Sequence, residues 1–303
     1  MTSPRLSAQR IRLAVISEGV NSWPLYAAQA QRLFEREGID VETTLTGSSV
    51  RQLAQLTRGD FDIGLQQSDH IVRGVESGSD LFVFMARAHA PELSLVVAPA
   101  INSFADLKGK DIAVDGARSG YALLLRKLLV EKGLPESELR FREIGGSQER
   151  FDALKSGAAV ASFLNPPFDR NLFAAGFRSL GTTLDYFPRY PGSVAAARRS
   201  WARENEQRLV AFIRAFNAAY AWLTDARNQE EAVRMLTARL NIEAKAATAA
   251  YGKFVALPQP AITPEALRQA IDVVWEAEGY NGAKGAPEKY MDLSFLQKAQ
   301  QAR

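Results

Sequence analysis

The sequence contains no cysteine and only two histidines, His70 and His89. A chain without thiols forms no disulfides and no thiolate metal sites, and it cannot use thiol catalysis. The two histidines are 19 residues apart, and this spacing matches no short metal-binding motif and no catalytic histidine motif. We therefore expect no metal ion and no cofactor, and we expect both histidines at the surface or in a hinge.

Long hydrophobic runs are also missing. No segment approaches the roughly 20 apolar residues that span a bilayer; the best is the short run over 93–101. The opening MTSPRLSAQR lacks the apolar segment of a secretory signal and is expected to be an unfolded leader over residues 1–10. We expect the protein in the periplasm, with its signal removed from the sequence shown, or in the cytoplasm if the sequence is complete.

Clusters of basic residues are scarce, and the net charge is only +3. Nucleic-acid-binding proteins normally carry a basic stripe or patch, whereas Lys and Arg are scattered along this chain, so we expect no nucleic-acid partner. Phosphate-binding loops are missing as well. The run GARSG at 116–120 has no GK[ST] ending, and no GxGxxG follows the first strand, which excludes the ATP and dinucleotide motifs.

The chain does contain two similar blocks in which strand and helix patterns alternate. Its 303 residues, 47% of them hydrophobic, suffice for two globular domains. The first block runs through strands at 11–16, 41–45 and 61–65, with helices at 23–37 and 49–58 between them. The second block repeats the alternation over 111–181, and helices follow residue 200. The pattern predicts an α/β protein with mostly parallel sheets flanked by helices, with ligands at the carboxyl ends of the strands.

Several segments together resemble a known family. They are SEGVNSWPLYAAQAQRLFEREGIDVE at 17–42, GSS at 47–49, GDFDIG at 59–64, DLKGKDIAV at 106–114 and GARSGYALLLRKLLVEKGL at 116–134. This series resembles the type II periplasmic substrate-binding proteins of ABC transporters, in the nitrate, sulfonate, taurine and thiamine-precursor group. The resemblance covers roughly residues 10–255.

The resemblance implies a fold of two lobes joined by a two-strand hinge, here at 92–98 and 190–196. Residues 11–97 plus 191–303 would form lobe I with a helical C-terminal tail, and 98–190 would form lobe II. It also implies a monomer that captures a small organic, anionic ligand, such as a sulfonate or carboxylate, by hinge closure. The partner would be the permease of an ABC importer.

The same resemblance places the ligand contacts in five segments at strand ends and helix starts. Helix starts favour anions through unpaired N–H groups and the helix dipole, and an arginine there adds a two-pronged contact to an acidic group. Aromatic rings at such positions supply flat apolar walls. The expected ligand-binding residues are Ser17, Asn21, Trp23, Ser48, Ser49, Gln66, Gln67, Arg118, Ser119, Gly120, Tyr121, Asn165 and Phe168.

Simpler roles stay open for several of these residues. Ser48 or Ser49 serves equally well as a helix N-cap, Trp23 as a hydrophobic staple and Arg118 as an exposed surface charge. Asn165 precedes a proline, as a turn former would. At the level of the protein, the alternative is a cytosolic enzyme on the same fold, of the menaquinone-pathway or aromatic-acid decarboxylase type, because fold alone does not fix function.

Overall fold

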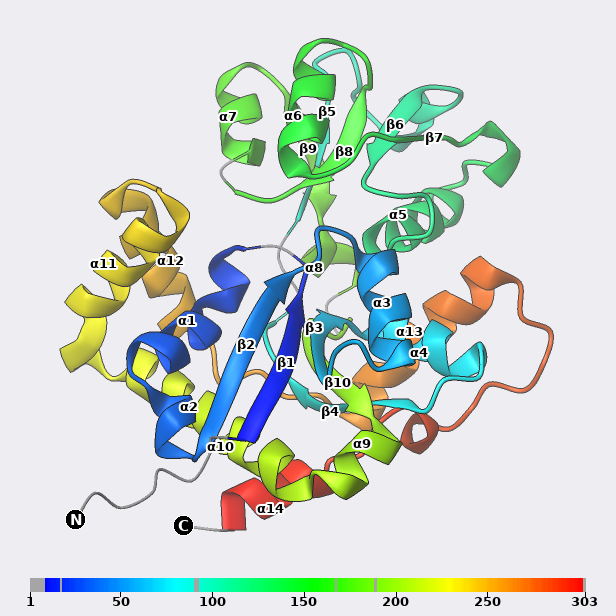
Figure 1. Cartoon of the computed structure of the whole chain (residues 1–303). Helices are drawn as coiled ribbons and strands as arrows, with labels where there is room; N and C mark the ends of the chain where they lie inside the picture. The colour runs from blue at the N-terminus through cyan, green and yellow to red at the C-terminus, as the bar shows by residue number, and fades with distance from the viewer. Residues whose placement is uncertain (1–8, 17, 90–92, 167, 188–189, 302–303) are drawn as a thin grey trace, which may run out of the picture. The chain divides into compact units, whose positions relative to one another are not determined.

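The computed structural model describes residues 9–16, 18–89, 93–166, 168–187 and 190–301. It divides into two compact units (Figure 1). The first unit consists of residues 1–89, 191–264 and 286–303, and the second of residues 90–190 and 265–285. Each unit contains its own five-stranded sheet. Two α/β units with mixed, mostly parallel sheets confirm the predicted fold class.

The sheet of the first unit has the strand order β2-β1-β3-β10-β4. The strands are β1 (Gln9–Val15), β2 (Ile39–Leu45), β3 (Ile63–Gln67), β4 (Leu81–Ala86) and β10 (Ser193–Arg198). β1 pairs in parallel with β2 and β3, whereas β10 runs antiparallel to β3 and β4. The return strand β10 is therefore inserted between strands of the first block.

Helices cover both faces of this sheet (Figure 1). One face packs on α1 (Trp23–Ala30), α2 (Leu33–Arg36) and the long α10 (Glu206–Thr224). The predicted apolar stripe of α10 is buried there, and the rings of Phe34 and Phe212 stack at 5.6 Å. The helices α11 (Gln229–Leu240), α12 (Ala244–Val255) and α14 (Ser294–Gln301) extend this core. The other face carries α3 (Ser49–Arg58) and α4 (Ser68–Glu76).

The sheet of the second unit has the order β7-β6-β8-β5-β9. Its strands are β5 (Ser94–Val97), β6 (Asp111–Val114), β7 (Arg140–Glu143), β8 (Ala161–Leu164) and β9 (Arg178–Thr182). β6 pairs in parallel with β7 and β8, and β5 is antiparallel to β8. The helices are α5 (Gly120–Glu131), α6 (Ser147–Lys155), α7 (Phe168–Ala174), α8 (Thr183–Tyr186) and α13 (Pro264–Glu278).

Three features of the expected organisation need correction. β1 begins at Gln9, inside the leader predicted over 1–10. The second unit begins at 90 rather than 98, and residues 265–285 of the helical tail group with it instead of with the first unit. The chain consequently passes between the units after residues 89, 190, 264 and 285, not through two hinge segments alone. The apolar face of α13 gave no sign in the sequence of which sheet it would cover.

Candidate functional site

The strand ends of the first unit lie level with one another, as the parallel pattern predicts. Val15 is opposite Leu45 of β2 and opposite Leu65 of β3. Ser193, the first residue of the antiparallel β10, is opposite Gln67. The loop after β1, the start of α3, Gln66, Gln67 and the start of β10 therefore meet at one edge of this sheet. Ser17 lies outside the described residues.

Ser48 is the N-cap of α3, because its Oγ accepts a hydrogen bond from the backbone N of Arg51 at 3.3 Å. Ser49 is the first residue of the helix. One turn into α3, Gln52 is completely buried, and its Nε2 donates to Leu65 O at 2.9 Å. Its Oε1 accepts from Thr46 Oγ1 at 2.9 Å. These bonds hold the start of α3 against the ends of β2 and β3.

A buried arginine that the sequence analysis missed joins four parts of this edge. Arg87 follows β4 and is only 9% exposed. Its Nε donates to Ser193 Oγ and its terminal nitrogen donates to Ser22 Oγ, both at 3.0 Å. Ser193 Oγ in turn donates to Gln66 O at 3.2 Å. Nothing in the local sequence marks Arg87, because its burial depends on strands distant in the chain.

The other expected residues of the first unit differ in environment. Asn21 lies half-buried in a short 3₁₀ helix, Val20–Ser22. Trp23 begins α1 and is fully buried, with its ring 5.9 Å from that of Tyr251 and 5.6 Å from that of Phe254. The Trp23 ring is thus part of the hydrophobic core. Within the described part of the chain, no hydrogen-bond partner is found for Trp23 Nε1.

In the second unit, the start of α5 follows the end of β6. Ser119 is the N-cap and accepts from Ala122 N at 3.3 Å, and its Oγ donates to Asp115. Gly120 is buried and Tyr121 is half-buried. Arg118 lies just before the cap, with its side chain 71% exposed, and forms an ion pair with Glu278 of α13. The expected anion-binding group therefore already has an acidic partner within its own unit.

Asn165 and Phe168 lie at the end of β8 and the start of α7. Asn165 Oδ1 accepts from Ser147 Oγ at 2.7 Å, and the Phe168 ring lies 5.9 Å from that of Phe151. Behind them is a second unforeseen arginine, Arg150, which donates to Phe163 O at 2.7 Å and to Gly145 O at 3.0 Å. Burial lowers the pKa of Arg150 from its usual value, and nearby carboxylates, Asp115 first, partly offset this.

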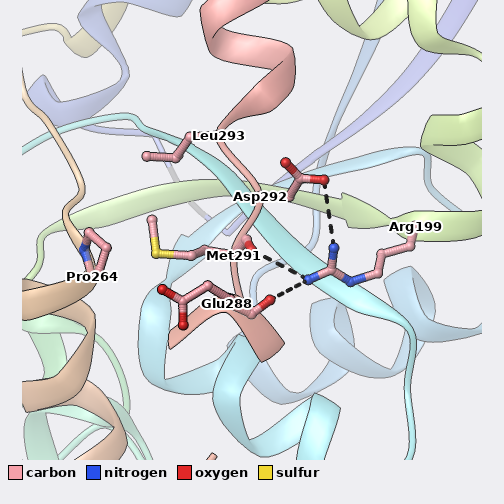
Figure 2. Close-up of a pocket in the computed structure, with 6 residues that line it drawn as sticks. All are labelled: Arg199, Pro264, Glu288, Met291, Asp292 and Leu293. Carbon is pink, nitrogen blue, oxygen red and sulfur yellow. Dashed lines mark hydrogen bonds and ion pairs between the residues drawn. The ribbon is translucent and has the colours of Figure 1, made fainter. Parts of the chain in front are cut away.

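A separate hollow in the first unit (Figure 2) contains a third arginine, Arg199. Its guanidinium donates to the carbonyl oxygens of Glu288 and Lys289, both at 3.2 Å, and lies 3.8 Å from the carboxylate of Asp292. These contacts attach the C-terminal segment to the rest of the unit. The hollow is a structural junction and contains none of the expected ligand-binding residues.

The two histidines differ, and only His70 departs from the expected surface or hinge position. His70 is 4% exposed in α4, which corrects the expectation of a surface or hinge residue. His89 is partly exposed, and its Nε2 lies 2.8 Å from Pro258 O. Among the described residues, no group of three or more acidic, histidine or cysteine side chains could hold a metal ion. No described helix combines the length and apolar character needed to cross a membrane.

Comparison with known families gives one match over most of the chain. Residues 20–232 match the family described as NMT1/THI5 like. A bicarbonate transport ATP-binding protein, CmpC of Synechocystis, is 24% identical over 71% of this chain. The chain spans only 35% of the length of that relative.

Solved structures show the same fold at low sequence identity. The alkanesulfonate-binding protein SsuA of Xanthomonas axonopodis pv. citri, bound to MOPS, has a TM-score of 0.73 and 18% identity. That alignment covers 93% of this chain and 98% of SsuA. The periplasmic nitrate-binding protein NrtA of Synechocystis PCC 6803 has a TM-score of 0.79 and 14% identity, with coverage of 97% and 89%. These likenesses confirm the predicted two-unit fold.

Proposed function

The chain belongs to the NMT1/THI5-like family, and from this membership we propose that it is a solute-binding protein. It captures a small organic anion, such as a sulfonate or carboxylate, by hinge closure and delivers it to an ABC importer. The solved relatives are named as sulfonate-binding and nitrate-binding proteins, and the curated relative as a transport protein. These names favour binding and delivery over the alternative of an enzyme on the same fold.

The observation that carries this proposal is the chemistry of the strand ends in each unit. α3 and α5 begin at the carboxyl ends of parallel strands, capped by Ser48 and Ser119. The start of each helix presents backbone N–H groups and a partial positive charge, which favour an anionic group. Arg118 stands beside one start, and a guanidinium suits carboxylate and sulfonate geometry.

The same proposal includes the residues that contact the ligand, the cellular compartment and the oligomeric state. The ligand contacts come from Ser17, Asn21, Gln66 and Gln67 with the start of α3 in the first unit, and from residues 118–121, Asn165 and Phe168 in the second. We assign the protein to the periplasm, as a monomer that docks on the importer's permease. Trp23 contributes to the binding edge through its core packing, because its ring is fully buried.

A ligand screen tests capture and closure together. Small sulfonates, carboxylates, nitrate and bicarbonate are added separately, and the unfolding midpoint is recorded. A ligand at about 100 times its Kd stabilises the folded state by about 2.7 kcal/mol, so a specific ligand gives a clear upward shift. Small-angle scattering should then show compaction at saturation. A tight ligand without compaction would contradict hinge closure.

The role of Arg118 is tested with the best anion from that screen. Arg118→Ala removes a hydrogen bond to a charged ligand group and should weaken binding by at most about 1.5–3 kcal/mol, because the ligand must first replace Glu278 as the partner of Arg118. Arg118→Lys should restore only part of the loss, since an ammonium lacks the planar fork. Arg140→Ala is the matched control, because Arg140 is exposed at the amino-terminal end of β7 and pairs with Asp111 at 3.1 Å.

Isothermal titration of the four proteins provides the measurement. Unchanged affinity in a folded Arg118→Ala variant would reject the arginine contact. The ligand would then be assigned to the neutral groups Ser17, Asn21, Gln66 and Asn165.

A further inference from the structure

Gln66 is a buried amide without hydrogen-bond partners. The residue is 1% exposed, yet neither Oε1 nor Nε2 has a partner among the described residues. Gln52 provides a direct comparison, because it is equally buried and both of its amide atoms are bonded. The lack of partners at Gln66 is therefore not a general property of buried glutamines in this unit.

The alternation of side chains along β3 shows on which face of the sheet Gln66 lies. Side chains two residues apart share a face of the sheet. A Cβ added at Gly64 would lie 2.9 Å from Leu56 Cδ2 and 3.6 Å from Gln52 Nε2, so this face is the one covered by α3. Gln66 is on the same face, two residues nearer the carboxyl end of the strand. The Gln66 side chain thus lies on the face covered by α3, near the edge where that helix begins.

Two further acceptors near this edge also lack donors. Within the part of the chain that the structure describes, Gln67 Oε1 and Asp69 Oδ1 are buried and have no hydrogen-bond partner. Asp69 is completely buried, and its other oxygen accepts from Arg73 at 2.6 Å. With Gln66 Oε1, three acceptor oxygens lack donors, and the amide nitrogen of Gln66, which has two N–H groups, lacks an acceptor. The buried hydroxyl of Ser68, which can donate or accept, also has no partner among the described residues.

Buried polar groups in folded proteins are nearly always satisfied, since an unmade bond costs the full desolvation of the group. A methionine fills nearly the volume of a glutamine and has no amide to satisfy. Glutamine at position 66 therefore lowers the stability of the fold in a way that methionine would not. The residue lies at a strand end, where ligands of α/β proteins bind. A ligand that makes these bonds removes the cost.

We propose that Gln66 binds an amide-type edge of the ligand, in which an N–H group stands beside a carbonyl oxygen. The ligand N–H donates to Gln66 Oε1, and the ligand carbonyl accepts from Nε2. Nitrate and simple sulfonates have acceptors only and leave Oε1 without a donor. This inference rests on the proposed solute-binding function, and it narrows the ligand class to small molecules that contain a carboxamide, lactam or similar group.

Matched probe pairs test the ligand class by isothermal titration of the full chain. Uracil is compared with 1,3-dimethyluracil, which keeps both carbonyls and loses both N–H groups, and nicotinamide with N,N-dimethylnicotinamide, which keeps the carbonyl and the neutral charge and loses both N–H groups. We expect the N–H-bearing member of at least one pair to bind on the order of tenfold or more tightly than its partner. Gln66→Met should abolish that preference. Methanesulfonate and nitrate serve as the oxyanion probes.

The possible failures are distinguishable. Binding of an oxyanion with no preference for either N–H-bearing probe overturns the amide-edge inference and leaves the solute-binding function standing. An N–H preference that survives Gln66→Met also overturns it, because another residue then reads the ligand. Absence of binding by every probe counts against both the inference and the proposed function.

Thermal unfolding without ligand gives an independent readout. Gln66→Met should leave the midpoint unchanged or raise it, because it removes two unsatisfied groups. Gln52→Met should lower the midpoint by several degrees, because it leaves Leu65 O and Thr46 Oγ1 without their partner. If Gln66→Met lowers the midpoint as much as Gln52→Met, the Gln66 amide supports the fold and the inference is rejected.

Discussion

Burial raises the pKa of Tyr220 to about 12. The side chain lies on the inner face of α10, 5% exposed, and its ring is 4.7 Å from that of Phe254. The fold therefore favours the neutral phenol over the phenolate. An unfolded chain loses the same proton near pH 10.

The shift at Tyr220 predicts a loss of stability in alkali. Its contribution is complete below pH 10 and is lost as the pH rises from about 10 to 12, because the unfolded state gives up its proton first. The slope is at most about 1.4 kcal/mol per pH unit. Urea unfolding between pH 9 and about 11.5 should show a steeper decline for the natural protein than for Tyr220→Phe. Parallel declines would contradict the assignment.

Three arginines show how strongly the burial and the contacts of a single side chain depend on its surroundings in the fold. Arg118 is largely exposed, whereas Arg87 is buried and Arg150 half-buried, and these two donate to serine hydroxyls and backbone carbonyls. A guanidinium has five donors in a rigid fork, so a buried arginine can hold several strand ends in place. Sequence reasoning selected Arg118 because it precedes a helix start, and it had no means of selecting the other two.

At the scale of single elements, the turn before α3 decides which serine caps the helix. Gly47 has φ +67°, in the left-handed region that glycine adopts without strain. That turn brings the Ser48 side chain over the first helical turn, where it accepts from Arg51 N. Ser49 is the first helical residue, and its side chain does not cap the helix.

The two serines should accordingly differ when replaced. Ser48→Ala should cost about 0.5–2 kcal/mol of unfolding free energy, the usual value for a lost N-cap. Ser49→Ala should cost a few tenths at most, because alanine is favourable inside a helix. Chemical denaturation of both variants measures the difference. Equal losses, or a larger one for Ser49→Ala, would show that the cap has been assigned to the wrong residue.

At the scale of the whole molecule, the C-terminal segment returns to the first unit and pairs with the edge strand β4. Val83 N donates to Tyr290 O at 2.8 Å, and Asp292 N donates to Val83 O at 2.9 Å. Tyr290 is fully buried. Arg199 binds the carbonyls of this segment (Figure 2), with its guanidinium 4.9 Å from the Phe82 ring. The segment thereby covers an exposed strand edge.

Arg199 should therefore matter more than its neighbours in α9 (Arg199–Glu204). Arg199→Ala removes the bonds to the carbonyls and the contact with Phe82, so we expect a loss of about 1–3 kcal/mol and faster proteolysis beyond residue 285. Arg203→Ala is the control on the same helix, because Arg203 is exposed and surface substitutions usually change stability by less than about 0.5 kcal/mol. Equal stability of the two variants would contradict the inference that Arg199 holds the C-terminal segment in place.

Local patterns of residues are enough to predict several features of this protein. The alternation of strands and helices, the two blocks, the apolar stripe of α10 and the family all follow from residues close together in the chain. Parallel pairing then places the strand ends at one edge of each sheet, so Ser48 and Gln66 could be expected there in the first unit, and Ser119 and Asn165 in the second. Each of these residues lies within a few residues of a predicted strand end or helix start, and this local signal is enough to place it.

Other features depend on residues that are distant in the chain and become visible only in the folded protein. Arg87 donates to Ser22 and Ser193, which are 65 and 106 residues away in the chain, so its buried position depends on distant partners. Gln52 in α3 and Gln66 in β3 are both buried glutamines, and only the packed structure shows that the amide of the first is hydrogen-bonded and that of the second is not. The destination of α13 is decided in the same way. An amphipathic face requires burial but does not specify its partner, because burial of apolar surface is non-directional.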